Sequence, residues 1–130
     1  MRFLFVCVEN SCRSQMAEAF ARIHGGDAVD AHSAGSRPSG VVNAKAIASM
    51  AEVGYELSGH VSKGLDGVPG NVFDYVITMG CGDECPVVPA VAHEDWDIPD
   101  PKDLVGDDFR SVRNLIEAKV KKLLVGALGR

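Results

Sequence analysis

The stretch RFLFVCV (Arg2–Val8), followed directly by ENSCRS (Glu9–Ser14), decides the fold. The first stretch is an apolar run rich in Phe and Val, which is typical of a strand buried on both faces in a parallel sheet. The second is polar and leads into Ser14–His24, where apolar residues recur at helical spacing. The sequence therefore predicts a strand, a short loop and a helix in immediate succession.

The rest of the chain continues this alternation of strands and helices. Further strands are predicted at Val29–Ala34, Phe73–Met79 and Val91–Trp96, a second helix from a capping Asn43 to Val53, and a last helix from Asp107 or Asp108. Such alternation implies a doubly wound α/β sheet, and 130 residues suffice for one domain, 1–130. Ligands bind such sheets at the carboxyl ends of the strands.

Composition and charge limit the classes of protein to which the chain can belong. Hydrophobic residues make up 46% and charged residues 24%, as in ordinary globular proteins. The net charge of −5 and the lack of a long basic run argue against binding of nucleic acid. No apolar stretch reaches the length of a membrane span, and the N-terminal run does not resemble a signal peptide. We therefore expect a cytoplasmic protein, in which the four cysteines do not form a structural disulfide framework.

The loop after the first strand has the features of an oxyanion site. Cys7 is followed by five residues and then Arg13, directly before a helix. Backbone N–H groups at a helix N-terminus cradle anions, and the guanidinium of Arg13 can close the cradle bidentately. A thiol at the floor of such a site is expected to have a lowered pKa and to attack the bound anion. The residues predicted to bind the oxyanion are Val8, Glu9, Asn10, Ser11, Cys12 and Arg13.

Two further side chains in this region have predicted roles. The hydroxyl of Ser14 can donate to the sulfur of Cys7, and Asn10 can brace the loop in a left-handed turn. The alternative is that Cys7 is an ordinary buried cysteine and Arg13 a surface residue of the helix. The combination of strand, cysteine, arginine and helix favours the catalytic interpretation.

These residues carry a resemblance to a known family. The loop Cys7–Ser14, its continuation SQMAEA (Ser14–Ala19) and the segment SAG (Ser33–Gly35) resemble the low-molecular-weight protein tyrosine phosphatases and the arsenate reductases that share their fold. The resemblance covers nearly the whole chain. It implies a single domain with a four-stranded parallel sheet flanked by helices. We expect no cofactor and no metal site.

The resemblance also implies a general acid, which the leaving oxygen requires. In the family this acid is an aspartate followed by proline late in the chain, and Asp100-Pro101 is the matching pair, with Asp97 a weaker candidate. The alternative is that Asp100 is a solvated loop residue. The phosphatases usually carry an aromatic residue after this pair, whereas Lys102 stands here, which weakens the phosphatase interpretation.

A second pair of cysteines, Cys81 and Cys85, lies in a Gly-rich loop after the third strand. This loop resembles the redox segment of thioredoxin-coupled arsenate reductases, with shorter spacing than in the best-known members. It implies that Cys81 attacks Cys7 and that Cys85 passes the disulfide outward. Cys12 is interpreted as structural. The alternatives are that both thiols are inert or that they bind zinc with His60 or His93.

Some family members hold potassium near the residues matching Asn10 and Glu18, with further oxygen ligands from the segment that matches 58–63 here. Val61 and Lys63 replace two of those ligands, and Lys63 can supply the positive charge. We therefore expect no requirement for potassium, although Lys63 can equally be solvated. The expected structural partners of Glu18 are Asn10, Ser33 or Lys63.

The leading hypothesis is reduction of arsenate to arsenite by Cys7 and a disulfide relay, recycled by thioredoxin or another thiol reductant such as glutaredoxin. The alternative is a phosphatase that hydrolyses phosphate monoesters with Cys7, Arg13 and Asp100. A redox or arsenic sensor is a third, less favoured function. We expect a monomer that binds neither nucleic acid nor membranes.

Overall fold

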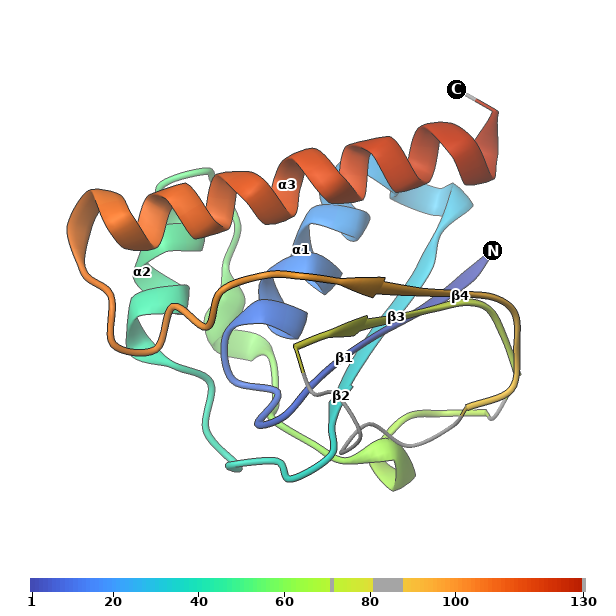
Figure 1. Ribbon diagram of the computed structural model, residues 1–130, viewed down its shortest axis with the longest axis horizontal. Coiled ribbons are helices and arrows are strands. Elements are labelled where there is room, and N and C mark those ends of the chain that lie inside the picture. Colours follow the sequence, from blue (N-terminus) through green and yellow to red (C-terminus); the bar gives the residue numbers. More distant parts are fainter. Residues whose placement is uncertain (71, 81–87, 130) are drawn as a thin grey trace.

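The computed structural model describes residues 1–70, 72–80 and 88–129. Four strands form one sheet in the order β2-β1-β3-β4, and every neighbouring pair is parallel (Figure 1). The strands are β1 (Arg2–Cys7), β2 (Asp30–Gly35), β3 (Phe73–Met79) and β4 (Ala90–Trp96). The expected four-stranded parallel sheet is therefore confirmed.

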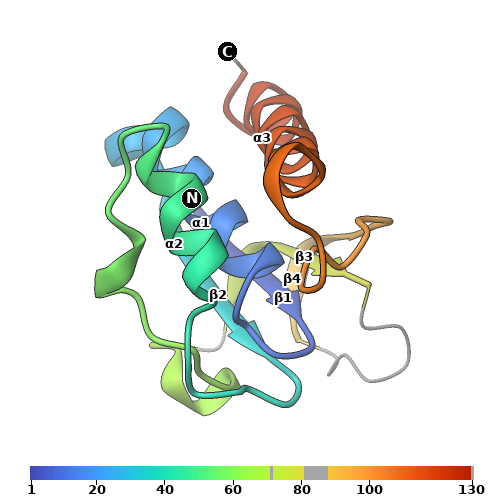
Figure 2. The ribbon, with the colours of Figure 1, turned by 90° about the vertical axis from the view of Figure 1, so that its left-hand side faces the viewer.

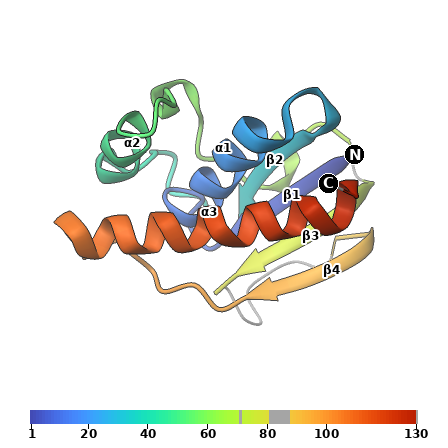
Figure 3. The same cartoon turned by 90° about the horizontal axis from the view of Figure 1, so that it is seen from above.

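Three α-helices and three short 3₁₀ turns connect the strands. The helices are α1 (Arg13–Gly25), α2 (Ala44–Ala51) and α3 (Gly106–Leu128), and the turns are η1 (Gly26–Ala28), η2 (Leu57–Gly59) and η3 (Leu65–Gly67). Figures 2 and 3 show α1 and α3 running across one face of the sheet, with α2 beside the start of α1. No helix of the described chain combines the length and the apolar character needed to cross a bilayer.

The strand β1 lies in the interior of the sheet and is buried on both faces. Phe3 and Phe5 belong to the core beneath the helices, whereas Leu4 and Val6 pack on the opposite face with Val68 and its neighbours. None of these four β1 side chains is more than 1% exposed. This two-sided burial explains why the strand reads as a continuous apolar run rather than as alternating apolar and polar residues.

The boundaries of some elements differ from the prediction. The first strand ends at Cys7 rather than Val8, and the first helix begins at Arg13 rather than Ser14. The last helix begins at Gly106, one residue before the first of the two predicted starts, so that Asp107 and Asp108 lie in its first turn, where carboxylates favour the helix dipole. The second helix ends at Ala51, two residues early, but its cap is as predicted: the Asn43 side chain accepts from the Lys45 backbone N–H at 2.8 Å.

The carboxyl ends of three strands meet at one edge of the sheet. Cys7, the last residue of β1, pairs in register with Gly35 of β2, and Val6 pairs with Thr78 of β3. The chain then passes from β1 into α1 through residues 8–12. The strand β3 ends at Met79, and the next residue, Gly80, lies against the side chain of Arg13 at the start of α1. The fold thus gathers the chemically important residues at the edge where parallel sheets bind ligands.

Candidate active site

The loop between β1 and α1 has its carbonyl oxygens turned outward. Each carbonyl from Cys7 to Cys12 accepts a hydrogen bond from elsewhere, at 2.8–3.2 Å. The donors are the backbone N–H groups of Ser36, Arg37, Ser39, Asn43 and Met16 and the side-chain amide of Gln15. In a trans peptide the C=O and N–H groups point in opposite directions, so the amides of 8–13 turn to the inside of the loop. The loop has the geometry that an anion cradle requires.

The N-terminus of α1 contributes to the same cradle. Cys12 occupies the N-cap position and makes no capping hydrogen bond through its side chain. The first amides of a helix have no partner within the helix, and the helix dipole places partial positive charge there. An oxyanion in the loop can therefore take the place that a capping side chain normally fills.

Gly35 allows β2 to approach the loop closely. A Cβ atom at this position would lie 2.7 Å from the carbonyl oxygen of Val8 and 2.9 Å from the backbone nitrogen of Asn10. Both contacts are with backbone, which cannot move aside without disturbing the loop. This steric requirement gives a physical reason for glycine in the Ser33–Gly35 segment, which carries part of the family resemblance.

Asn10 fixes the orientation of the hydroxyl that contacts Cys7. Its side-chain oxygen accepts from the backbone N–H of Lys63 at 3.0 Å and from the side chain of Gln15 at 2.9 Å. Its side-chain nitrogen therefore faces Ser14 and donates to the hydroxyl at 2.7 Å. Because Ser14 accepts this bond, its own proton is available to the sulfur of Cys7, 2.9 Å away. The predicted hydrogen bond from Ser14 to Cys7 thus has a structural basis in Asn10.

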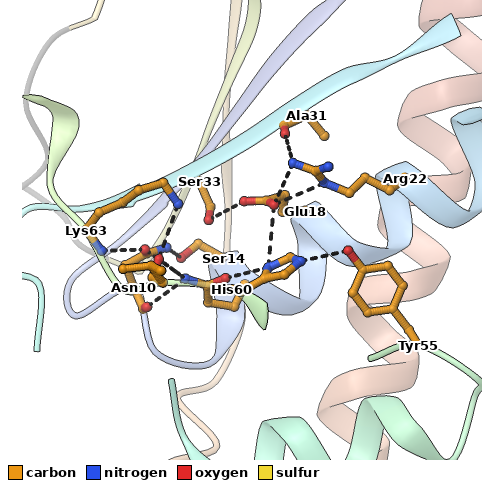
Figure 4. Close-up of polar contacts among 11 residues, drawn as sticks. Asn10, Ser14, Glu18, Arg22, Ala31, Ser33, Tyr55, His60 and Lys63 are labelled. Atoms are coloured by element: carbon orange, nitrogen blue, oxygen red, sulfur yellow. Dashed lines mark hydrogen bonds and ion pairs between the residues drawn. The ribbon is translucent and has the colours of Figure 1, made fainter. Parts of the chain in front are cut away.

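The same network extends away from the sulfur through the buried Gln15 to the half-buried His60 and Tyr55; Figure 4 shows the last two. Gln15 uses its nitrogen to donate to Asn10, so its oxygen must accept, and it lies 2.9 Å from Nδ1 of His60. The other ring nitrogen, Nε2, lies 2.7 Å from the hydroxyl of Tyr55. A neutral His60 that carries its proton on Nδ1 satisfies both contacts. Every hydrogen bond from Tyr55 to Cys7 then donates toward the sulfur.

Sequence reasoning missed Gln15, Tyr55 and His60 as parts of this network. Gln15 has no exposed surface, although it directly follows the loop as a polar residue on a helix. Tyr55 and His60 lie between the predicted helix that ends at Val53 and the predicted strand that begins at Phe73, where no helix or strand was predicted. Gln15 could have been predicted, because it is a polar residue next to Ser14 in the first turn of a buried helix. Tyr55 and His60 come from a distant segment, and no sequence pattern links them to the loop.

Arg13 and Asp100 face each other at the site. One terminal nitrogen of Arg13 donates to the carbonyl of Ile98 at 3.2 Å, and the other lies 3.8 Å from a carboxylate oxygen of Asp100. The side chain of Arg13 is 9% exposed and that of Asp100 is 54% exposed. Gly80 makes room for the guanidinium, since a Cβ atom there would lie 2.2 Å from it. Arg13 is therefore not the exposed helix residue of the alternative interpretation.

A pocket of about 270 Å³ joins these groups. It is lined by Cys7, Val8, Glu9, Ser11, Cys12, Arg13, Arg37, Gly80, Asp100 and Lys102. The candidate nucleophile, the guanidinium and the Asp-Pro carboxylate thus share one cavity, and Asp97, the weaker acid candidate, is not among its described lining residues. Cys81 and Cys85 lie outside the described residues.

Cys12 differs from Cys7 in its surroundings. Burial raises the pKa of the Cys12 thiol to about 12. Cys12 therefore stays protonated at neutral pH, and a protonated thiol is a poor nucleophile. This agrees with the interpretation of Cys12 as structural, while its backbone still forms part of the loop.

Behind the loop, basic groups surround the buried carboxylate of Glu18 (Figure 4). Ser33 donates to it at 2.7 Å, as was expected, and Arg22, one helical turn later, pairs with it at 3.0 Å. Nδ1 of His60 lies 3.5 Å away. The Nζ of Lys63 donates to the carbonyl of Val61 at 3.3 Å, and burial lowers the pKa of Lys63. Arg22 is therefore the direct cationic partner of Glu18, which sequence reasoning missed; independence from potassium stays a prediction.

Comparisons with known proteins place this geometry in a family. The family model of the low molecular weight phosphotyrosine protein phosphatases matches residues 2–130, and the chain belongs to this family. The glutaredoxin arsenate reductase of Synechocystis sp. is 38% identical over 126 residues, which cover 95% of each chain. Arsenate reductase 2 of Staphylococcus saprophyticus is 40% identical over 122 residues, covering 91% of this chain and 92% of that relative.

Solved structures agree with the sequence relatives. An arsenate reductase in a phosphate-binding state has a TM-score of 0.85 at 36% identity, covering 96% of this chain and 97% of that one. The thioredoxin-dependent arsenate reductase of Corynebacterium glutamicum has a TM-score of 0.80 at 30% identity, covering 99% of this chain and 63% of that one. A tyrosine phosphatase of Erwinia amylovora shares the fold, with a TM-score of 0.77 at 22% identity and coverage of 99% and 93%.

Proposed function

We propose that this chain is an arsenate reductase that uses Cys7 as its nucleophile. The observation that carries the proposal is the position of the Cys7 sulfur at the end of β1, in one pocket with Arg13 and Asp100 and 2.9 Å from a hydroxyl that is oriented to donate to it. Inward amides and a guanidinium stabilise a tetrahedral oxyanion above the sulfur. Relatives at 38–40% identity are named arsenate reductases, which favours this activity over the phosphatase alternative.

The first chemical step forms an arsenic–sulfur bond. The thiolate of Cys7 attacks the arsenic of bound arsenate, and the bond from arsenic to one of its hydroxyl oxygens breaks. Asp100, at the mouth of the pocket, gives its proton to the departing oxygen, which leaves as water. The hydrogen bond from Ser14 holds the sulfur in place for this attack.

The second step transfers two electrons from thiols to arsenic. Cys81 attacks the sulfur of Cys7, the electron pair of the sulfur–arsenic bond goes to arsenic, and arsenite leaves with a Cys7–Cys81 disulfide behind. Cys85 then attacks Cys81, which restores Cys7 and moves the disulfide outward. The described chain supports this order because it leads to Cys81 through Gly80, which lies against the guanidinium of Arg13.

An external dithiol must reduce the final disulfide. The candidate reductants are thioredoxin and glutaredoxin. One similar protein is named a glutaredoxin arsenate reductase and another a thioredoxin-dependent arsenate reductase, and both align with most of this chain. Thiols stay reduced in the cytoplasm, so we propose that the protein acts there. We also propose that it acts as a monomer and does not bind nucleic acid.

The test is arsenate-dependent oxidation of NADPH in two coupled assays. One contains thioredoxin and its reductase, and the other contains glutaredoxin, glutathione and glutathione reductase. We expect turnover in at least one assay, at least about 100-fold slower turnover for Cys81→Ser and Cys85→Ser, and hydrolysis of para-nitrophenyl phosphate that these two variants retain.

Cys7→Ser provides the control, since it should lose both activities. A Cys81→Ser variant that reduces arsenate at the wild-type rate would refute the relay. Absence of arsenate turnover in both assays, with ester hydrolysis intact, would refute the reductase and leave the phosphatase.

A further inference from the structure

Two oppositely charged side chains meet across the mouth of the pocket. The Nζ of Lys102 lies 3.2 Å from a carboxylate oxygen of Glu9. Glu9 belongs to the loop after β1, whereas Lys102 follows the Asp100-Pro101 pair on the other side of the pocket. The two residues are 93 positions apart in the sequence. The pair therefore joins the anion-binding loop to the segment that carries the candidate acid.

The backbone is fixed on both sides of this pair. The N–H of Lys102 donates to Asp100 at 3.0 Å, and its carbonyl accepts from the Nζ of Lys45 at 2.6 Å. The carbonyl of Glu9 accepts from the backbone N–H of Ser39 at 3.0 Å and from the hydroxyl of Ser62 at 2.9 Å. Only the ends of the two side chains are free to part, since Lys102 is 54% and Glu9 38% exposed.

A carboxylate at the mouth of an anion site poses an electrostatic problem. An incoming oxyanion with two negative charges is repelled by Glu9, and water screens this repulsion only in part at short range. The ammonium of Lys102 compensates the charge of Glu9 from close range, and the same contact raises the pKa of Lys102. An exposed ion pair contributes little to folding stability, so its effect here lies in where it places the charge.

The position of the pair also affects larger substrates. In-line attack by Cys7 requires the leaving group to point away from the sulfur, toward the mouth and Asp100. For arsenate this group is a single oxygen, but for a phosphate monoester it carries the whole organic part of the substrate. The backbone N–H of Lys102 donates to Asp100, and its side chain reaches across to Glu9. The organic part of an ester must therefore pass beside this pair or displace it.

We propose that Lys102 is a specificity-determining residue that, paired with Glu9, admits small inorganic oxyanions and disfavours aryl phosphate esters. The inference rests on the function proposed above and names the substrate selection of the same site. The pair has two separable effects. The positive charge of Lys102 screens the incoming anion from Glu9. The bulk of the two side chains narrows the path for an organic leaving group.

A double-mutant cycle tests the screening effect. Binding of inorganic phosphate is measured by calorimetry for the wild type, Lys102→Gln, Glu9→Gln and the double variant; phosphate binding needs neither the relay nor a reductant. We expect Lys102→Gln to weaken binding about three- to tenfold at low ionic strength, because Glu9 is then unscreened. The double variant should return to within about twofold of wild type. The difference should shrink in about 1 M salt, where the Debye length is about 3 Å.

Lys121→Gln, on the exposed face of α3, is the matched control, since it changes the net charge equally without contacting the pocket. The screening effect would be refuted if Lys102→Gln kept the wild-type affinity for phosphate. It would also be refuted if Lys102→Gln weakened phosphate binding equally in the wild type and in the Glu9→Gln variant. The same would follow if Lys121→Gln weakened binding as much as Lys102→Gln does.

Ester selection is tested by the ratio of kcat/KM for para-nitrophenyl phosphate hydrolysis to kcat/KM for arsenate reduction. The double glutamine variant serves as the control here, because it removes both charges but keeps most of the bulk. The double variant Glu9→Ala/Lys102→Ala is equally balanced in charge but opens the mouth, so we expect its ratio to rise at least about fivefold above that of the control. An unchanged ratio would overturn this part of the inference. Should the wild type fail to reduce arsenate at all, the proposed function itself fails; a flat cycle in an active reductase removes only the inference.

Discussion

Asn10 combines an unusual backbone conformation with three side-chain hydrogen bonds. Its φ of 51° is the only positive value for a non-glycine among the described residues. Asparagine tolerates this left-handed region better than most residues. The conformation turns the loop while the side chain contacts Gln15, Ser14 and the backbone of Lys63. The predicted brace therefore acts both on the loop and on the hydroxyl that serves Cys7.

Two substitutions at this position separate the contributions of backbone and side chain. Asn10→Gly keeps access to the left-handed region, whereas Asn10→Ala does not. Both remove the hydrogen bond to Ser14 together with the two that the Asn10 oxygen accepts. We expect similar losses of arsenate turnover, about tenfold or more, because Ser14 is no longer oriented. Asn10→Ala should also lower the free energy of unfolding in urea by about 1 kcal/mol relative to Asn10→Gly. Full activity in Asn10→Gly would show that Ser14 does not need Asn10.

The residues that sequence reasoning could predict are those whose relation is set by short covalent spacing. Cys7, Arg13 and Ser14 lie within one strand–loop–helix unit, so their convergence follows from the local fold. Gln15 and His60 meet only because the segment after η2 returns to the loop, which no local pattern records. The pairing of Lys102 with Glu9 was hidden for the same reason, although both positions were visible in the sequence.

The end of β3 places a glycine against the guanidinium of Arg13. Gly80 has a φ of +71°, and its substitution by alanine would bring a Cβ atom to 2.2 Å from that guanidinium. Gly54, after α2, has a comparable φ of +85°, but a Cβ atom there would meet no atom within 4 Å. The two glycines therefore share the conformational requirement and differ in the contact.

Gly80→Ala should displace Arg13 and weaken binding of inorganic phosphate at least about tenfold. Gly54→Ala should leave phosphate affinity unchanged and lower the free energy of unfolding by about 1 kcal/mol, the cost of alanine in a left-handed conformation. Calorimetry and urea unfolding of both variants provide the measurements. Equal affinities of the two variants would show that Gly80 does not position Arg13.

The helices and strands themselves were largely predictable, because their apolar spacing is set by burial. Boundaries were less accurate where tertiary contacts replace local signals. The helix α1 begins at Arg13 without a side-chain cap, since its first amides belong to the anion loop. The helix α3 begins at Gly106 after the extended Val105, although the two aspartates that follow resemble a capping signal.

The stability of the protein should depend on the protonation of His60. Burial lowers the pKa of His60 below its usual value near 6.5. Between the two values the unfolded chain binds more protons than the folded chain, so the free energy of unfolding rises with pH across this window. The free energy of unfolding should therefore fall as the pH drops from about 7 to about 5. In this range the folded protein must protonate His60, whose second ring N–H would face the Tyr55 hydroxyl that donates to it.

His60→Asn can keep a donor toward Gln15 but does not titrate. We expect a weaker dependence of the free energy of unfolding on pH for this variant, measured by urea denaturation between about pH 5 and 7. Val61→Ala, at the exposed position directly after His60, removes no titrating group; it is the control and should keep the wild-type slope. An unchanged slope in His60→Asn would show that other groups dominate this window.

The complete fold was predictable mainly through the family resemblance. Alternation of elements indicated an α/β sheet, but the order β2-β1-β3-β4 depends on long-range pairing. The choice between reductase and phosphatase could not follow from Cys7, Arg13 and Asp100, because the two reactions use the same groups. Lys102, where the phosphatases usually have an aromatic residue, and the second cysteine pair favoured the reductase over the phosphatase.

The outward attachment of every carbonyl in the anion loop has a consequence for how the reaction proceeds. Three separate parts of the chain hold the loop: the segment after β2, the segment after η2 and the first turn of α1. Dipoles anchored in this way already point at the spot where negative charge develops, so they need not rotate as bonds to arsenic form and break. The solvent-like rearrangement that slows the same reaction in water is thereby avoided, and substrate should bind without remodelling the loop.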